Sequence, residues 1–410
     1  MTGGRAVFAF VLAASFFTYA FVQRVAPSVI VGELMTEFAV GAAVLGNLAA
    51  FYFYGYAPLQ IPVGMLMDRF GPRRLMSFAV GVSAIGAAIF AVAPTIEIAY
   101  LGRLLVGIGA GFSWVGVLTV ATLWFPPTRF AMLTGFAQLF GMIGAIFGQA
   151  PLALSVDAWG WRGTLGALAV FGAILAVGIF AVIADKRIVA TQAKASFAAG
   201  LRGVLRSRDA WLATGYGFAM TGTMLSFAGL WAVPWLMQTH GLERGSAALL
   251  TSIMFAGWGI GSPAIGYSVD RLGHRVGAAR LLSAAMALSL AAILYLPMGL
   301  PVLAVLMFVN GVCASSMVIA YAHARDHSPA NASGAAYGLV NTAVVGSGAV
   351  LQPSIGALLD RAWDGGLAAG GARLYSAEAY GQGFSILLAV AVLGALSAWL
   401  MREPAPAKTL

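Results

Sequence analysis

The chain has 410 residues, of which 60% are hydrophobic and only 9% are charged, whereas soluble domains carry about 25% charged residues. Its formal net charge is +9, and its one cysteine, Cys313, cannot form an intrachain disulfide. This composition excludes a soluble enzyme, a nucleic-acid-binding protein and a secreted disulfide scaffold, and it indicates a chain that lies largely within lipid.

Apolar runs long enough to cross a bilayer recur along the chain, because a helix of about 20 apolar residues spans the hydrocarbon core. The first run follows Arg5 and is interpreted as an uncleaved helix rather than a signal peptide, since similar segments follow it. We therefore predict an all-α integral membrane protein with twelve transmembrane helices. The predicted spans are 6–22, 41–67, 75–93, 98–123, 131–154, 163–183, 211–238, 247–269, 281–298, 301–323, 333–358 and 383–401.

Basic residues are concentrated on one side of this arrangement. The side that holds both termini carries 17 of the 23 lysines and arginines, and the other side carries four. Cytoplasmic loops of membrane proteins hold such an excess. We predict a multi-pass protein of the cytoplasmic (inner) membrane with both termini in the cytoplasm, whose positive charge reflects orientation rather than an anionic macromolecular partner.

Two halves of the chain carry the same marks. The loop 64–74 and the loop 266–275 each contain Gly-x-x-x-Asp-Arg-x-Gly, and their aspartates lie 202 residues apart. Gln138 and Asn341 form a second matching pair, 203 residues apart. We therefore interpret the chain as a duplicated six-helix unit, an arrangement known among transporters. The predicted units are an N-terminal bundle (1–184), a cytoplasmic linker (185–210) and a C-terminal bundle (211–410).

The Gly-x-x-x-Asp-Arg-x-Gly-x-Arg-Arg loop at 64–74 resembles the signature of the major facilitator superfamily. Twelve spans, the weaker second loop, the run Arg103-x-x-x-Gly107-x-Gly109-x-Gly111 and Gly160-Trp161-Arg162 extend the resemblance over the whole chain. It implies two pseudo-symmetric six-helix bundles that alternate access, and a loop motif that latches the cytoplasmic side in the outward-open state. The alternative for that motif is a solvated turn without a gating role. The implied gating residues are Asp68, Arg69, Gly71, Arg73, Arg103, Asp270 and Arg271.

Arg24 and Arg103 lie inside predicted spans, where an arginine costs at least about 2.5–3.5 kcal/mol unless it is paired or hydrated. Both could snorkel to the outer headgroups, Arg103 beside Glu97. Alternatively, Arg24 faces a cavity and binds an anion through paired hydrogen bonds. The stretch Val22-Gln23-Arg24 is similar to helix 1 of organic-anion and organophosphate exchangers of the superfamily. Spans 7 and 8 lack the second cation of those exchangers, which favours a monovalent anion or a zwitterion.

Tyr52, Tyr56 and Gln60 are spaced i, i+4, i+8 and therefore share one helical face. A substrate could bind there, although tyrosines also suit the membrane interface. A buried amide side chain needs a hydrogen-bond partner. The alternative role for each amide in the predicted spans is therefore a hydrogen bond between helices. The further candidates for substrate binding are Gln138, Trp231, Trp258, Asn310 and Asn341.

No Asp or Glu lies deep within a predicted span, and the four histidines fall in loops or at span ends. His323 and His327 are interpreted as a cytoplasmic cluster rather than a proton relay. We predict a secondary transporter of a small organic anion or zwitterion, with import favoured over export, coupled to a proton or a counter-anion. It should be a monomer without enzyme activity, cofactor or metal. The alternatives are a multidrug or sugar-type exporter and, less favoured, a membrane sensor without transport.

Overall fold

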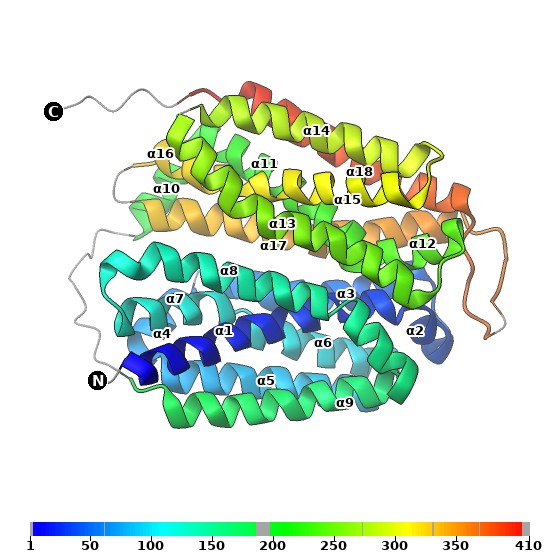
Figure 1. Cartoon of the computed structure of the whole chain (residues 1–410), viewed down its shortest axis with the longest axis horizontal. Helices are drawn as coiled ribbons and strands as arrows, with labels where there is room; N and C mark the ends of the chain where they lie inside the picture. Colours follow the sequence, from blue (N-terminus) through cyan, green and yellow to red (C-terminus); the bar gives the residue numbers. More distant parts are fainter. Residues whose placement is uncertain are drawn as a thin grey trace.

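The computed structural model describes residues 3–60, 62–185, 197–272, 274–329, 332–368 and 370–403. These residues form helices joined by short connections, with one isolated β-bridge between Leu367 and Arg373. Figure 1 shows the helices of the first half of the chain side by side in one group, and those of the second half in another.

The described α-helices of the first group are α1 (Gly3–Val25), α2 (Val31–Phe38), α3 (Ala42–Tyr56), α4 (Pro62–Phe70), α5 (Pro72–Val92), α6 (Ile96–Ala110), α7 (Ser113–Trp124), α8 (Phe130–Phe147) and α9 (Ala150–Val182). The second group follows the predicted linker, and its described α-helices are α10 (Phe197–Arg206), α11 (Arg208–Ser226), α12 (Ala232–His240), α13 (Arg244–Leu272), α14 (Arg275–Tyr295), α15 (Leu300–Ala314), α16 (Val318–Asp326), α17 (Ser333–Arg361) and α18 (Ala377–Leu400). Residues 186–196 of that linker lie outside the described residues, so its boundaries stay predictions.

Each predicted span falls on one of these helices or on consecutive ones. Among the described residues, nine stretches are long and apolar enough to cross a membrane, and a tenth arises if α2 and α3, bent by 113°, count as one span. Large apolar side chains such as Phe78, Leu288 and Trp399 are exposed on the outside, as expected for a surface that faces lipid. The predicted all-α membrane fold is confirmed.

One predicted boundary differs in detail. The loop expected between spans 5 and 6 is largely helical, because α9 runs through it and turns sharply at Gly160, where φ is 69° and ψ is 164°. Glycine lacks a Cβ and adopts this left-handed φ without strain. The boundary between the two spans is therefore a kink within α9 rather than a loop.

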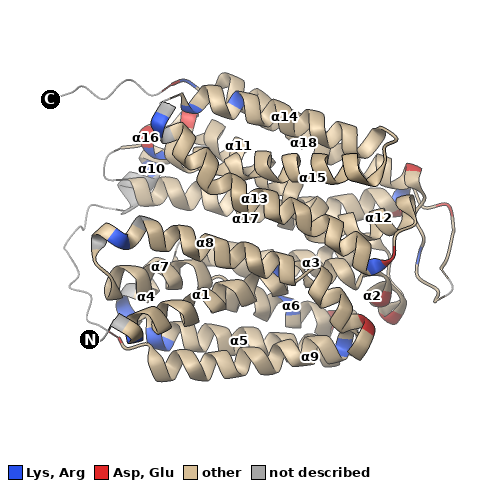
Figure 2. Ribbon diagram, in the orientation of Figure 1, with Lys and Arg blue, Asp and Glu red and all other residues tan. Residues whose placement is uncertain are grey.

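The two ends of the molecule differ in charge. Figure 2 shows many basic residues at the end where α1 begins and α18 finishes, and acidic residues together with basic ones at the other end. The first is called the basic end here and the second the opposite end. By their positions in or beside the helices, the described arginines at the basic end are Arg5, Arg69, Arg73, Arg74, Arg129, Arg202, Arg206, Arg208, Arg271, Arg275, Arg280, Arg325 and Arg402.

Equivalent carboxylates cap equivalent helices at the basic end. Asp185, just after α9, accepts a hydrogen bond of 2.9 Å from the backbone N–H of Arg73 at the start of α5. Glu403, just after α18, accepts one of 2.9 Å from the N–H of Val276 at the start of α14. A negative charge stabilises the positive N-terminal end of a helix. The duplicated sequence thus produces duplicated tertiary contacts.

The two groups of helices touch most closely through α3 and α17. A Cβ built on Gly356 of α17 would lie 2.1 Å from the carbonyl oxygen of Ala42, and one built on Gly46 of α3 would lie 2.5 Å from that of Gln352. No side chain fits in either place. Small residues let the backbones of membrane helices approach this closely, and here they close the opposite end.

Charged contacts also join the groups at the opposite end. Arg244 at the start of α13 pairs with Glu33 of α2 and lies 3.2 Å from Asp157 of α9. Asp360 of α17 accepts hydrogen bonds from the backbone N–H groups of Ala42 (3.0 Å) and Ala43 (2.9 Å) at the start of α3. The contacts of all three carboxylates cross between the two halves of the chain.

Asp360 is itself supported by the loop that follows α17. Arg373 lies 3.0 Å from its carboxylate, and the hydroxyl of Tyr375 donates to it at 2.5 Å. Burial and this hydrogen bond to Asp360 raise the pKa of Tyr375, so its hydroxyl stays protonated and remains a donor. The cap on α3 is therefore a network rather than a single pair.

Replacing Gly356 by valine should separate α3 from α17. Overpacking a tight contact costs about 1–3 kcal/mol, so we expect a lower melting temperature in detergent than for the parent. Gly346→Val is the matched control. Gly346 is also on α17, but a Cβ built there meets nothing within 4 Å. Equal melting temperatures for the two variants would contradict the close contact.

Candidate binding cavity

A cavity of about 1000 Å³ lies between the two groups of helices. Its lining on α8 comes from residues 132–139, on α13 from 258–263, and on α17 from 334–345. Each stretch lies in the part of its helix toward the basic end. The cavity therefore extends toward the basic end, whereas the opposite end is closed by the contacts of α3 with α17.

Arg24 on α1 lines this cavity and is only 7% exposed. Its guanidinium carbon lies 4.2 Å from the ring centre of Phe21, 5.4 Å from that of Tyr52 and 5.2 Å from that of Tyr56. Its Nε donates to the Tyr52 hydroxyl at 3.4 Å. Aromatic faces attract a cation, so these rings hold the guanidinium in place.

Arg24 has no counter-charge in the part of the chain that the structure describes. None of its described contacts is with a carboxylate. Among the described lining residues there is no Asp or Glu, and Arg24 is the one Lys or Arg. A buried charge normally has a partner. The cavity therefore offers an unneutralised cation to an anionic ligand.

Arg103 on α6 is buried behind this site rather than directed to the surface, at 1% exposure. Its Nη1 donates to the carbonyl oxygen of Gln23 at 2.7 Å, and its Nη2 to that of Ala49 at 3.3 Å. The ring of Tyr52 lies 5.2 Å from it. Arg103 thus joins α6 to α1 and α3 and adds positive charge beneath Arg24, while Glu97 is not its partner.

A chain of hydrogen bonds crosses the cavity from one half to the other. The hydroxyl of Tyr321 donates to Asn341 Oδ1 at 2.7 Å, and Asn341 Nδ2 donates to Gln60 Oε1 at 2.7 Å. All three residues line the cavity. Because a ligand could replace either bond, these groups can serve as polar contacts beside Arg24.

The structure brings most of the predicted binding residues together, but not all of them. Tyr56, Gln138 and Trp258 line the cavity as well, and Tyr52 reaches it through Arg24. Six aromatic residues of the described lining were not singled out from sequence, because aromatic residues are common throughout the apolar runs. They are Phe17, Phe21, Trp114, Phe136, Tyr321 and Tyr337.

Trp231 and Asn310 lie away from the cavity lining. Trp231 is fully buried, and its indole N–H donates to the carbonyl oxygen of Gln352 at 3.2 Å. Asn310 donates to the carbonyl oxygen of Met286 at 3.2 Å and to Ser289 Oγ at 3.0 Å. Both therefore make the interhelical contacts that were the alternative for buried polar groups.

The predicted gating loop makes contacts within the first half. Gly71 has a φ of 79°, and a Cβ there would lie 2.3 Å from Asp185 Oδ1. Arg73 Nε donates to the carbonyl oxygen of Phe180 at 2.7 Å, and Arg69 is exposed. In the second loop, Arg271 donates to the Tyr267 hydroxyl at 3.0 Å.

The side chains of Asp68 and Asp270 lie outside the described residues. The gating role of both loops therefore stays a prediction.

Comparisons with known proteins agree with this architecture. A family model described as Major Facilitator Superfamily matches residues 9–274 and 212–410. A gentisate transporter of Corynebacterium glutamicum is 27% identical over 346 residues, which cover 82% of this chain and 76% of that protein. A "Probable sulfoacetate transporter" of Cupriavidus necator is 24% identical over 277 residues, and the match spans 64% of each chain, less than two thirds of that relative's length.

Solved structures share the fold at lower identity. A bacterial homologue of the human lysosomal transporter Spinster, in an inward-facing and unoccupied conformation, superimposes with a TM-score of 0.74 at 19% identity, covering 97% of this chain and 96% of that one. A nucleoside transporter gives a TM-score of 0.76 at 14% identity, covering 95% and 99%. These similarities show the fold alone.

Replacing each buried arginine by methionine should separate their roles. Arg24→Met removes an unpaired charge, so we expect the ligand-free protein to gain up to about 1–2 kcal/mol. Arg103→Met removes the hydrogen bonds to the carbonyl oxygens of Gln23 and Ala49, which should cost about 1–3 kcal/mol. Thermal unfolding in detergent measures both. If Arg24→Met were as destabilised as Arg103→Met, the guanidinium of Arg24 would have a stabilising partner.

Proposed function

The chain belongs to the major facilitator superfamily, and from this premise we propose that it is a secondary active transporter of a small organic anion. The observation that carries the proposal is the unneutralised Arg24 in a cavity whose lining holds no carboxylate. A guanidinium binds a carboxylate or sulfonate through paired hydrogen bonds. A substrate with one negative charge, alone or in a zwitterion, balances the single cation of the lining.

The rest of the lining suits a substrate with an apolar body. Phe17, Phe21, Trp114 and Trp258 surround the space next to Arg24, and apolar walls with few polar groups are typical of small-molecule sites. Gln60, Asn341 and Tyr321 would contact a polar group on the substrate. The names of the relatives support this class, since gentisate and sulfoacetate are small organic acids.

The charge distribution supports a location in the cytoplasmic membrane with the basic end in the cytoplasm. With that orientation the cavity of this conformation opens inward, and the closed contact of α3 with α17 lies on the outside. Substrate would reach Arg24 from the outside once those contacts separate, as alternating access requires. Exchange, or a proton that accompanies the substrate, would supply the coupling to a monomeric carrier.

Transport of labelled acids into vesicles tests the role of Arg24. We expect Arg24→Gln to lose uptake of monocarboxylates or sulfonates at least about 10-fold, with Arg24→Lys intermediate, because lysine keeps the charge but loses the bidentate geometry. Arg129→Gln, at the exposed basic end, is the matched control. Uptake of acids by Arg24→Gln equal to that of the parent, or transport of lipophilic cations instead, would favour a multidrug or sugar-type exporter.

Substitutions of two aspartates should shift the equilibrium between the inward-open and outward-open states in opposite directions. Asp360→Asn weakens the cap on α3, so we expect faster alkylation of a cysteine placed at Ser28, which is buried toward the opposite end. Asp68→Asn should slow that alkylation and transport, if the loop motif latches the outward-open state. The native Cys313 is buried and contributes little background.

Asp364→Asn is the control for Asp360→Asn, because Asp364 is exposed in the loop that follows α17 and bonds only to the N–H of Gly366 among described groups. Equal alkylation rates for Asp360→Asn, Asp364→Asn and the parent would argue against a gate at α3. An unchanged transport rate for Asp68→Asn would remove the latch.

A further inference from the structure

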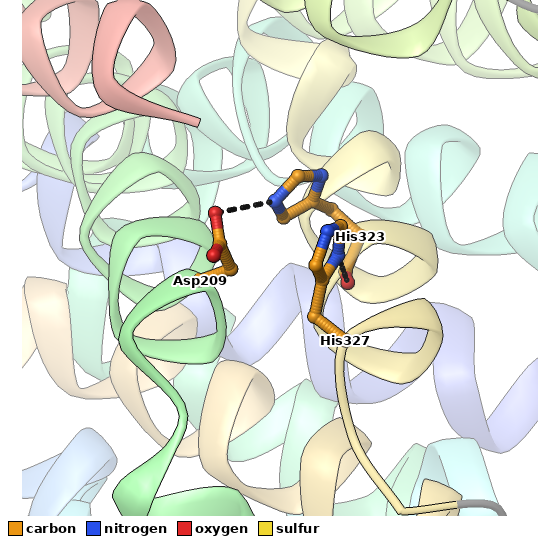
Figure 3. Close-up of side chains that lie close together, drawn as sticks. All are labelled: Asp209, His323 and His327. Carbon is orange, nitrogen blue, oxygen red and sulfur yellow. Dashed lines mark hydrogen bonds and ion pairs between the residues drawn. The ribbon is translucent and has the colours of Figure 1, made fainter. Parts of the chain in front are cut away.

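Three titratable side chains meet near the basic end, outside the cavity lining (Figure 3). His323 lies on α16 and His327 follows the end of that helix, four residues further on, and their ring centres are 4.2 Å apart. Asp209 comes from the first turn of α11, and its Oδ1 lies 3.6 Å from His323 Nε2. One ligand atom from each residue lies within 4.8 Å of the other two, which a single ion could bridge after small side-chain movements.

His323 lacks a hydrogen bond although it is buried. Its exposure is 1%, and neither ring nitrogen has a hydrogen-bond partner among the described residues. A buried polar group without a partner costs about 1–3 kcal/mol, so native proteins seldom leave one. The ring is directed toward Asp209 and His327 (Figure 3), which makes a ligand held between these groups the simplest partner.

His327 is arranged as a metal ligand would be. Its Nδ1 lies 3.0 Å from the carbonyl oxygen of His323 and donates to it, since the carbonyl can only accept. The lone pair of the neutral ring is then on Nε2. Histidines that bind metals commonly donate their other ring N–H to a backbone carbonyl in this manner, which sets the tautomer.

The surrounding charges leave the Asp209 carboxylate available. Asp326 neutralises the two nearby arginines, because it pairs with Arg275 and lies 2.8 Å from Arg325. Among the described groups, Asp209 accepts a long hydrogen bond of 3.4 Å from the backbone N–H of Arg402 and lies 3.6 Å from His323 Nε2. Its carboxylate is part-buried and keeps capacity for a cation.

We propose that Asp209, His323 and His327 bind a divalent metal ion of the kind that prefers imidazole, such as Zn²⁺ or Co²⁺. Two imidazoles and one carboxylate are a common ligand set for such ions, with water in the remaining position. Because Asp209 and His327 are only part-buried, that position can be reached from the basic end.

The ion would be regulatory rather than transported, since none of its three ligands lines the cavity. It would join α11 to α16, and α16 carries Tyr321, whose hydroxyl donates to Asn341 in the cavity. Binding would thereby hold one polar contact of the cavity in position without joining the two halves to each other.

The test is a titration of the full chain, purified without a histidine tag, with Co²⁺. We expect about one equivalent to bind with the intense visible bands of four-coordinate cobalt, and Zn²⁺ to displace it. His327→Gln and Asp209→Asn should each weaken Co²⁺ binding at least about 10-fold. Even the loss of a residue that only hydrogen-bonds to a metal ligand typically has an effect of that size. Both side chains are part-buried, so these variants should fold.

His240→Gln is the control, because His240 lies in α12 at the opposite end, and it should bind Co²⁺ as the parent does. Arg24→Gln should also bind normally, which separates this site from the proposed function. Equal Co²⁺ affinity for His327→Gln and the parent would overturn the proposal. So would a parent that gives no cobalt bands, or a His240→Gln variant that loses them.

Discussion

The feature on which the rest of the structure depends is a buried guanidinium without a counter-charge. Three aromatic rings hold Arg24 in the cavity, and Arg103 adds a second positive charge behind the shared ring of Tyr52. Keeping such charge out of water is costly, and cation–π contacts offset only part of that cost. The proposed anionic substrate would supply the negative charge that the described lining lacks.

The helices are held together by different interactions at the two ends of the molecule. At the opposite end, glycines let the backbones of α3 and α17 meet, and Asp360 caps the start of α3. Close packing in a membrane is short-ranged and cooperative, so these contacts either form together or separate together. At the basic end, Asp185 and Glu403 tie helices within each half. These contacts hold helices of the same half together, which the proposed movement of one half against the other would require.

Particular residues show where inference from the sequence succeeded and where it stopped. The all-α membrane fold and membership of the superfamily followed from apolar runs and repeated loops, and both are confirmed. Arg24 could be singled out because a cation inside an apolar run is costly in any fold. Trp231 and Asn310 carried the same kind of signal, yet they bond to backbone and side-chain groups in the packed interior. Phe21 and Trp114 line the cavity and gave no signal at all.

Apolar runs in the sequence were enough to predict helices that cross a membrane, because lipid requires spans of similar length with an apolar surface. Which face of each helix turns toward the cavity depends on how the helices pack. Helices that are apolar all round carry no period that distinguishes a lipid-facing side from a packed one. Asp209 lies 114 residues before His323 and 118 before His327, and the three meet because α11 packs against α16.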